Sequence, residues 1–228
     1  MDIKSELKKT YNDIASDFSV TRVFPWPELE VFIPYIKPGF KLLDLGCGNG
    51  RLLKTLSELE FSFDYLGIDF SQGLIEQAKK DWPSHKFAIG DIEKMDFPAA
   101  SFDAIFMIAS FHHIYGAKNR LALLKKINNW LKPGGYLFMT NWNLWQRKYL
   151  KYFFKNIKNK KEFNDFFIPY QLTSDKQKQT SDKERNWRYY HAFTAGELKS
   201  ILKKSGFELE PKGVYKTKFN LNSLVRKK

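Results

Sequence analysis

Short apolar runs of strand type alternate with amphipathic helical stretches through the centre of the chain. Strands are predicted near residues 41–46, 64–69, 86–90, 103–109 and 135–141. Helices are predicted near residues 50–59, 71–80 and 117–131, and the last one stops at a turn over 131–135. Strands that alternate with helices in this way are typical of a parallel sheet covered by helices on both faces.

The first 38 residues do not follow this alternation. A helix is predicted from Ile3 to Phe18, because apolar residues recur on one helical face. Pro25 and Pro27 are expected to keep residues 19–27 out of a helix. A second short helix is predicted over 28–35. The segment 1–38 is therefore expected to form a helical cap on the sheet domain.

The alternation also stops after Asn141. Residues 142–190 contain no clear strand–helix unit and are rich in lysine and aromatic residues. It resumes with a helix over 194–205, where Thr194 and Glu197 form a capping box. Two closing strands are expected near 207–215 and 217–224. Without an internal repeat or a low-complexity linker, the sequence predicts a single domain, 1–228, that carries a basic insertion over 142–190.

A glycine-rich turn follows the first predicted strand. Asp44 ends that strand, and Gly46, Gly48 and Gly50 follow at every second position. Glycines at this spacing let the backbone turn sharply and approach a ligand closely. The spacing departs from the dinucleotide pattern G-x-G-x-x-G, and a second acid, Asp69, ends the next strand. This arrangement resembles the S-adenosylmethionine site of class I methyltransferases.

That resemblance implies a fold and a set of cofactor contacts. The fold would be a seven-stranded, Rossmann-like sheet, mostly parallel, with its last strand antiparallel. The three glycines would pass close to the methionine part of the cofactor, and Asp69 would accept hydrogen bonds from the ribose hydroxyls. Asp91 and Ile92 would meet the adenine. Capping of a turn or helix is the alternative role for Asp69 and Asp91. The expected cofactor-binding residues are Asp44, Gly46, Gly48, Gly50, Asp69, Phe70, Asp91, Ile92 and Ala109.

A narrower resemblance lies outside the cofactor core. The segments 11–15, 21–22, 25–27, 111–113 and 188–193 are similar to the tRNA wobble-uridine carboxymethyl methyltransferases. Members of that family esterify 5-carboxymethyluridine in the anticodon. The resemblance runs from about Tyr11 to Phe207 and leaves only the middle of the insertion unmatched. It implies a tRNA substrate and a possible small activator subunit, since eukaryotic members work with a zinc-binding one.

The candidate acceptor residues follow from the chemistry of methyl transfer. A carboxylate is already ionised at pH 7, its pKa being about 4, so it needs orientation and charge compensation rather than a base. The chain lacks an Asn/Asp-Pro-Pro-Tyr motif after the fourth strand and has no second cysteine, which fits an oxygen nucleophile. We therefore expect Arg22, His113 and Arg188 to be catalytic. Tyr190 and His191 are weaker candidates, and Trp26 is either a core anchor or a cavity wall.

Each of these residues also has a simpler interpretation. Arg22 could be an ordinary surface residue, and His112 and His113 could serve packing at a helix start. His191 could be a structural histidine with satisfied hydrogen bonds. The single cysteine, Cys47, excludes an internal disulfide framework, and no metal site is expected.

The net charge of +13 indicates an anionic partner, nucleic acid first and a membrane surface second. From Arg147 to Arg188 there are twelve Lys/Arg residues against five Asp/Glu. We expect the lysines, including Lys158, Lys160 and Lys161, to contact RNA, and the aromatic stripe over 149–154 to be core. The segment 174–183 is expected to be a mobile loop.

No signal peptide and no apolar stretch long enough to span a membrane is apparent, so a cytoplasmic protein is expected. A small-molecule or quinone/lipid methyltransferase remains the alternative, because it would share the whole cofactor core. A degenerate methyltransferase serving as an RNA-binding scaffold is a third possibility. The intact glycine turn and Asp69 argue against that third possibility.

Overall fold

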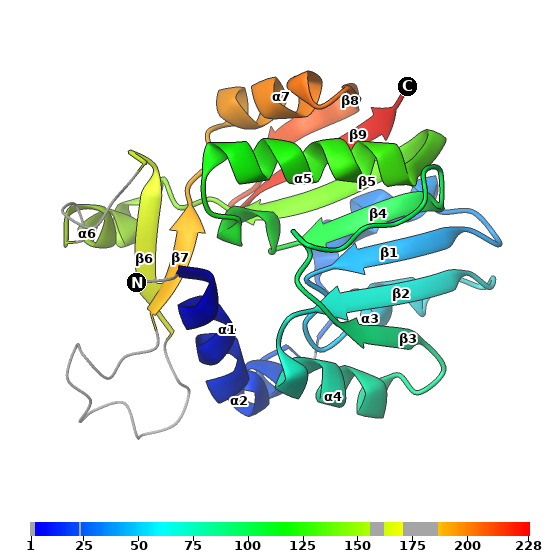
Figure 1. The fold of residues 1–228 in the computed structure, drawn as a ribbon, viewed down its shortest axis with the longest axis horizontal. Helices are drawn as coiled ribbons and strands as arrows, with labels where there is room; N and C mark the ends of the chain where they lie inside the picture. The colour runs from blue at the N-terminus through cyan, green and yellow to red at the C-terminus, as the bar shows by residue number, and fades with distance from the viewer. Residues whose placement is uncertain (1–2, 23, 156–161, 171–186) are drawn as a thin grey trace.

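A seven-stranded sheet forms the centre of the computed structural model, which describes residues 3–22, 24–155, 162–170 and 187–228 (Figure 1). The strand order is β3-β2-β1-β4-β5-β9-β8. The strands β1 to β5 run parallel, and β9 is antiparallel to both of its neighbours. The strands are β1 (Lys41–Leu45), β2 (Asp64–Asp69), β3 (Lys86–Ile89), β4 (Phe102–Ile108), β5 (Leu131–Trp142), β8 (Phe207–Lys216) and β9 (Asn220–Lys227). The predicted class I methyltransferase sheet is confirmed.

Helices cover both faces of this sheet because alternate strand residues point to opposite sides. Leu43 and Ile105 pack with α5 (Ala117–Trp130) and α7 (Ala195–Lys204) in one apolar cluster. Leu42 and Phe106 belong to a second cluster on the other face. That cluster includes α3 (Leu53–Leu56), α4 (Gln72–Asp81) and the 3-10 helix η1 (Pro27–Tyr35).

The N-terminal cap differs from its prediction in two places. The helix expected over 3–18 is split into α1 (Ile3–Asp13) and α2 (Ala15–Val20), since the buried Ile14 leaves helical geometry at φ −99° and ψ 2°. Residues 28–35 form the 3-10 helix η1, whose internal Pro34 cannot donate an α-helical hydrogen bond. Both helices of the split pair lie against the carboxyl ends of the parallel strands (Figure 1).

Two turns in the sheet domain also differ from expectation. Of the helix predicted over 50–59, only α3 is α-helical. The residues before and after it form turns with hydrogen bonds from the N–H of residue i+3 to the carbonyl oxygen of residue i. The helix stop predicted over 131–135 is part of β5, because Leu131 already pairs with Phe102. The register then shifts before Tyr136, and Gly134 has a positive φ of 75° within this irregularity.

The insertion contains a helix, α6 (Arg147–Lys155), and a two-stranded antiparallel sheet of β6 (Asp165–Pro169) and β7 (Trp187–His191). Neither strand was predicted. Phe153 is buried in a small core with β6 and β7, as expected, whereas Phe154 is 66% exposed, so the stripe is core only in part. The predictions for Lys158, Lys160, Lys161 and the loop 174–183 fall outside the described residues. Among the residues that the structure describes, no helix is long and apolar enough to cross a membrane.

Candidate active site

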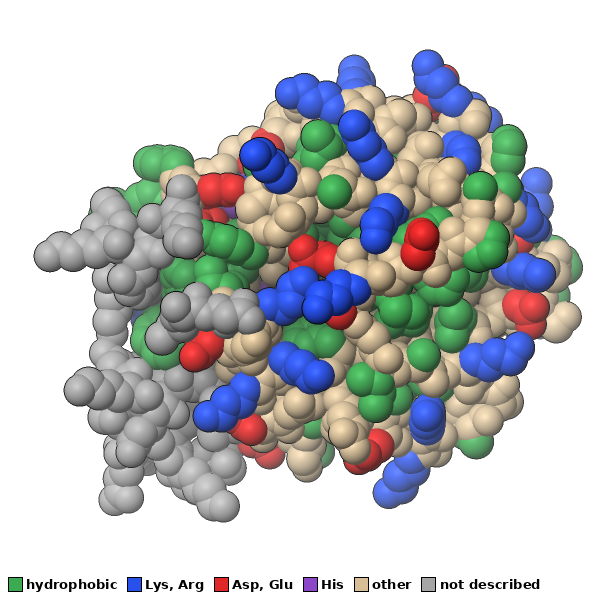
Figure 2. Space-filling view, viewed as in Figure 1, with side chains coloured by type: hydrophobic (Ala, Val, Ile, Leu, Met, Phe, Trp, Pro, Cys, Tyr) green, Lys and Arg blue, Asp and Glu red, His purple; other side chains and the backbone are tan. Residues whose placement is uncertain are grey.

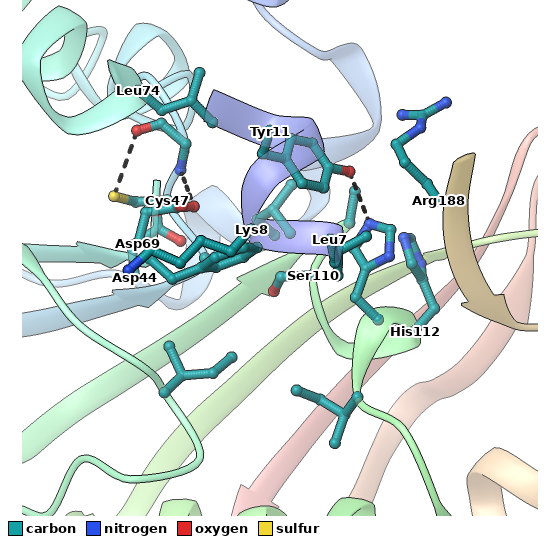
Figure 3. A pocket seen from close by; sticks show the side chains of 18 of the residues that line it. Leu7, Lys8, Tyr11, Asp44, Cys47, Asp69, Leu74, Ser110, His112 and Arg188 are labelled. Carbon is teal, nitrogen blue, oxygen red and sulfur yellow. Dashed lines mark hydrogen bonds between the residues drawn. The ribbon is translucent and has the colours of Figure 1, made fainter. Parts of the chain in front are cut away.

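A cavity of about 820 Å³ opens at the carboxyl ends of β1, β2 and β4, beneath α1. In parallel α/β sheets, ligands bind at this edge. Asp44 and Asp69 lie at one end of the cavity, and Tyr11, His112 and Arg188 lie at the other (Figure 3). The volume is large enough for a cofactor together with part of a second substrate.

The glycine turn forms the floor of the cavity. Gly46 and Gly48 line it with φ values of 76° and 55°, and a Cβ on Gly46 would lie 2.4 Å from the Cβ of Ser110. Only glycine fits position 46. Gly50, in contrast, is not among the lining residues, since its Cα faces the Trp82 ring and a Cβ there would lie 2.9 Å from it. Gly50 therefore serves the packing of the turn, and its expected approach to the cofactor stays a prediction that this packing does not support.

Asp44 is a buried carboxylate with one unsatisfied oxygen. Its Oδ2 accepts a hydrogen bond of 2.8 Å from the Tyr65 hydroxyl, while Oδ1 has no partner among the described residues. Burial raises the pKa of Asp44 to about 7. A cationic group in the cavity would satisfy Oδ1 and favour the ionised form.

Asp69 is held rigidly at the end of β2. Its two oxygens accept hydrogen bonds of 2.9 Å from the backbone N–H groups of Gly48 and Ser71. Burial raises the pKa of Asp69 to about 6. Each carboxylate oxygen has a further lone pair, so Asp69 can still accept hydrogen bonds from hydroxyl groups of a ligand. Asp69 can therefore cap the turn and bind a ligand at the same time.

The remaining cofactor candidates also line the cavity. Phe70, Asp91 and Ile92 are on its wall, and Ala109 adopts a positive φ of 54° beside it. The Nζ atom of Lys4 lies 3.1 Å from Asp91 Oδ2, so the first turn of α1 is joined to the wall across the cavity. The structure thus brings together all the expected cofactor residues except Gly50, and their binding roles stay a prediction.

His113 links three segments at the other end of the cavity. Its Nε2 lies 2.8 Å from the Tyr11 hydroxyl, and its Nδ1 lies 2.6 Å from the carbonyl oxygen of Tyr189. Burial lowers the pKa of His113 to about 3. The ring is therefore neutral, with Nδ1–H donating to the carbonyl and Nε2 accepting from the hydroxyl. Since both nitrogens are occupied, His113 orients its neighbours and is not placed to act as a base.

Arg188 on β7 is a buried cation with aromatic neighbours. Only 4% of it is exposed, and its Cζ lies 4.9 Å from the centre of the Tyr170 ring, 5.5 Å from Trp142 and 5.4 Å from Tyr190. Burial acts to lower the pKa of Arg188, but Tyr190 and Tyr11 outweigh that effect and raise it. Within the described part of the chain, no carboxylate pairs with Arg188, and its Nε has no hydrogen-bond partner.

Two further buried groups near Arg188 have no hydrogen-bond partner in the described part of the chain. His112 Nδ1 accepts a 3.1 Å hydrogen bond from the backbone N–H of Trp142, which leaves the proton on Nε2. That Nε2, like the Tyr190 hydroxyl, has no partner among the described residues, and both side chains line the cavity. The two rings are 5.0 Å apart. From the sequence, His112 was not chosen as a catalytic residue and packing was its alternative role, because no sequence signal distinguishes it from His113.

The rim of the cavity carries two arginines. Arg22 lines the rim with its guanidinium 4.0 Å above the Phe18 ring, and Arg51 lies 5.0 Å from the Trp26 ring. Burial lowers the pKa of Arg51, and the nearby charge of Arg22 lowers it further. Arg51, which follows the glycine turn directly, was not among the residues predicted from the sequence. Trp26 packs against the second core cluster and also lines the cavity, so both of its expected roles apply.

His191 lies outside the cavity, in a charged cluster that joins the insertion to α5 and α7. Its Nε2 is 2.6 Å from Glu197 Oε1, and its Nδ1 is 3.4 Å from Glu162 and 3.6 Å from Asp165. Burial acts to lower the pKa of His191, but hydrogen bonds to Asp165 and Glu197 outweigh it and raise the pKa. The Arg120 guanidinium donates to Glu162, so this carboxylate already has a cationic partner. His191 is therefore a structural residue rather than an acceptor ligand.

Comparison with known proteins gives consistent matches. Residues 43–139 match a methyltransferase domain family. A tRNA (carboxymethyluridine(34)-5-O)-methyltransferase of Saccharomyces cerevisiae is 30% identical over 75% of this chain and 58% of its own length. The corresponding protein of Schizosaccharomyces pombe is 28% identical over 87% of this chain and 86% of its own length. A tRNA (carboxymethyluridine(34)-5-O)-methyltransferase of Xenopus tropicalis is 28% identical over 85% of this chain and 36% of its own length.

The chain thus spans about 36% and 58% of the Xenopus and budding-yeast relatives. Among solved structures, a methyltransferase of Methanosarcina mazei superposes with a TM-score of 0.71 at 22% identity, over 86% of this chain and 96% of the other. At this identity the likeness establishes the fold alone.

The cavity fits S-adenosylmethionine, the cofactor of this domain family. The cofactor carries an ammonium and a sulfonium cation. The cavity is lined by two buried carboxylates, Asp44 and Asp69, and Oδ1 of Asp44 has no partner among the described residues. Gly48 in the glycine turn lines the cavity without a side chain, so a ligand can approach the backbone there. Residues 43–139 thus match a methyltransferase domain family, the fold is that of class I S-adenosylmethionine-dependent methyltransferases, and the sequence resembles the tRNA wobble-uridine carboxymethyl methyltransferases.

Proposed function

We propose that this chain is a methyltransferase that O-methylates the carboxymethyl group of a modified uridine at the wobble position of tRNA. The observation that carries the proposal is Arg188, a buried cation in the cavity with no carboxylate partner in the described part of the chain. Burying an unpaired charge is unfavourable, so such a site favours a ligand that supplies the opposite charge. An arginine binds a carboxylate with two parallel hydrogen bonds.

The neighbours of Arg188 support an acceptor that is already anionic. The Nε2–H of His112 and the hydroxyl of Tyr190 are donors with no hydrogen-bond partner among the described residues, and they suit the oxygens of a carboxylate. His113 is neutral and has both nitrogens occupied, so a base is not evident at the site. A carboxylate needs none, since it is ionised near pH 7.

The role of the protein in such a transfer is alignment. Bound S-adenosylmethionine supplies a methyl group on an electron-poor sulfur. Asp44, Asp69 and the glycine turn hold that cofactor, while Arg188 and His112 orient the acceptor oxygen. Holding both reactants in line can account for a large share of the rate enhancement. α1 excludes water from above, and Lys4 joins it to Asp91.

The partners follow from the same proposal. Lysine and arginine side chains are spread over the visible face of the molecule, with fewer acidic ones between them (Figure 2). This distribution and the net charge of +13 support an RNA substrate. A Haloferax volcanii methyltransferase solved with an activator protein shares the fold at a TM-score of 0.53 and 16% identity. We include a small activator subunit, a cytoplasmic location and a single-domain organisation in the proposal.

The test is methylation of tRNA that carries 5-carboxymethyluridine at the wobble position. We expect the wild-type protein to transfer a methyl group and Arg188→Ala to lower kcat/KM by roughly ten- to a hundredfold, as for loss of a charged hydrogen bond. Affinity for S-adenosylhomocysteine should change little, because Arg188 faces the acceptor end. Arg226→Ala is the matched control, since Arg226 is on β9 and pairs with Glu210.

Absence of any transfer by the wild-type protein, with and without an activator subunit, would contradict the proposal. Faster transfer to a small carboxylic acid or a quinone would instead favour the small-molecule alternative. Full activity of Arg188→Ala on the tRNA would remove the observation on which the proposal rests.

A further inference from the structure

An exposed aromatic ring stands at the mouth of the cavity. Phe219 is in the turn between β8 and β9, is 51% exposed, and lines the cavity. Because β8 runs parallel to β1–β5, this turn lies at the same sheet edge as the glycine turn. Among the described residues, Phe219 is the only exposed aromatic side chain that lines the cavity; the others are Phe24, Phe154 and Phe163.

The position of Phe219 is fixed by backbone hydrogen bonds. Its carbonyl oxygen accepts a 2.9 Å bond from the Asn143 N–H, and the turn is closed by a 2.8 Å bond from the Thr217 N–H to the Asn220 oxygen. The backbone is thus held from two sides, while the ring remains half in solvent. A fixed, exposed ring beside a cavity is suited to contact a ligand that enters it.

The ammonium groups of two lysines lie over this ring. The Nζ of Lys148 is 5.4 Å from the ring centre, and the Nζ of Lys218 is 5.2 Å from it. In the part of the chain that the structure describes, neither lysine has a carboxylate within ion-pair distance. An exposed ring with two unneutralised cations matches the combination that single-stranded nucleic acid requires, a stacking surface beside phosphate-binding charges.

We propose that Phe219 is a stacking platform for a nucleobase next to the methylated uridine, with Lys148 and Lys218 on the adjacent phosphates. This inference rests on the proposed function, since it assumes an RNA loop at the cavity. A uridine that enters the cavity must leave the base stack, and its neighbour loses a stacking partner. The ring of Phe219 replaces that partner. The platform binds any base, because every base has a flat face.

The test uses an anticodon stem–loop with the modified uridine, and compares Phe219→Ala and Phe219→Trp with the wild type. Base–aromatic stacking predicts that Phe219→Ala weakens stem–loop binding by about five- to 150-fold. The tryptophan variant should bind at least as tightly as the wild type. Affinity for S-adenosylhomocysteine should not change. Phe154→Ala is the matched control, because Phe154 is 66% exposed and is not part of the cavity.

A salt series tests the two lysines. Replacing Lys148 and Lys218 together by glutamine should flatten the plot of log affinity against log salt by about 1.4 units, at about 0.7 per phosphate on a single strand. If the wild type, Phe219→Ala and Phe219→Trp all bind the stem–loop with the same affinity, Phe219 is not a stacking platform. Binding of the stem–loop is measured apart from turnover, so the experiment tests the stacking role of Phe219 separately from the proposed methylation. A wild type that binds the loop through Phe219 without methylating it would contradict the proposed function alone.

Discussion

The Tyr11 hydroxyl lies 2.8 Å from Nε2 of His113 and joins the N-terminal helix to the residues that follow β4. The other ring nitrogen of His113 is 2.6 Å from the Tyr189 carbonyl oxygen on β7. One neutral side chain therefore connects three segments that are far apart in the sequence. Arg188 is the next residue back along β7, so this connection positions the proposed acceptor site.

We predict that His113→Gln keeps most of the activity that His113→Ala loses. A glutamine can donate to the Tyr189 carbonyl and accept from the Tyr11 hydroxyl, whereas alanine leaves both groups unsatisfied, each at a cost of about 1–3 kcal/mol. We expect at least a tenfold difference in kcat between the two variants, measured at saturating cofactor with matched thermal stability. Because the pKa of His113 is about 3, the wild-type kcat should show no inflection near pH 6.5 from this residue.

The same two variants would also reveal a catalytic base at His113. If the glutamine and alanine variants lose activity alike, and an inflection near pH 6.5 disappears in both, His113 acts as a base. That result would argue against a carboxylate as the acceptor.

The second prediction concerns the pH dependence of cofactor binding. The raised pKa of Asp44, about 7, means that the carboxyl group is largely protonated below pH 7 in the empty site. A cationic ligand favours the ionised form, so binding releases a proton and affinity rises with pH up to about 7. Below that value we expect a loss approaching tenfold per pH unit, with a further contribution from Asp69 below about pH 6.

Calorimetry with S-adenosylhomocysteine from pH 5.5 to 8.5 checks this expectation. Asp44→Asn should bind more weakly and lose the step near pH 7. Asp81→Asn is the control, since Asp81 is exposed at the end of α4. A pH-independent affinity in the wild type would show that Asp44 does not face the ligand.

The third prediction concerns stability, through His191. Its folded-state pKa is raised by hydrogen bonds to Asp165 and Glu197, which outweigh the effect of burial. A histidine whose pKa is raised in the folded state stabilises the fold fully at a pH below its pKa in the unfolded chain, about 6.5. This stabilisation is lost as the pH rises through the pKa of the folded state. The free energy of unfolding of the wild type should therefore fall over this range relative to His191→Gln.

Denaturant unfolding of both proteins between pH 6 and 9 measures the difference. Asp44 and Asp69 titrate in the same way in both proteins, so they cancel in the comparison. A difference that stays constant or grows with pH would mean that His191 is neutral in the folded protein. Its Nε2–H would then donate an ordinary hydrogen bond to Glu197.

The sequence by itself determined the sheet domain and the position of the cofactor cavity. The strands β1 to β4 begin and end within about two residues of their predicted bounds, because an apolar strand pattern is local. The cap of α7 is also local, and Thr194 Oγ1 accepts the N–H of Glu197 as expected. Asp44 and Asp69 share one edge because parallel strands place their carboxyl ends together.

Tertiary structure alone decided the chemical state of the side chains in the cavity. The direction that Gly50 faces depends on Trp82, 32 positions later in the chain, and the tautomer of His112 depends on a backbone N–H of β5. The strand β7 was missed because its partner β6 lies across an insertion without a regular pattern. Arg188 is informative only because it is buried and has no carboxylate partner in the described part of the chain. The burial and the hydrogen-bond partners of these side chains depend on segments that are distant in sequence. A local sequence pattern therefore cannot predict them.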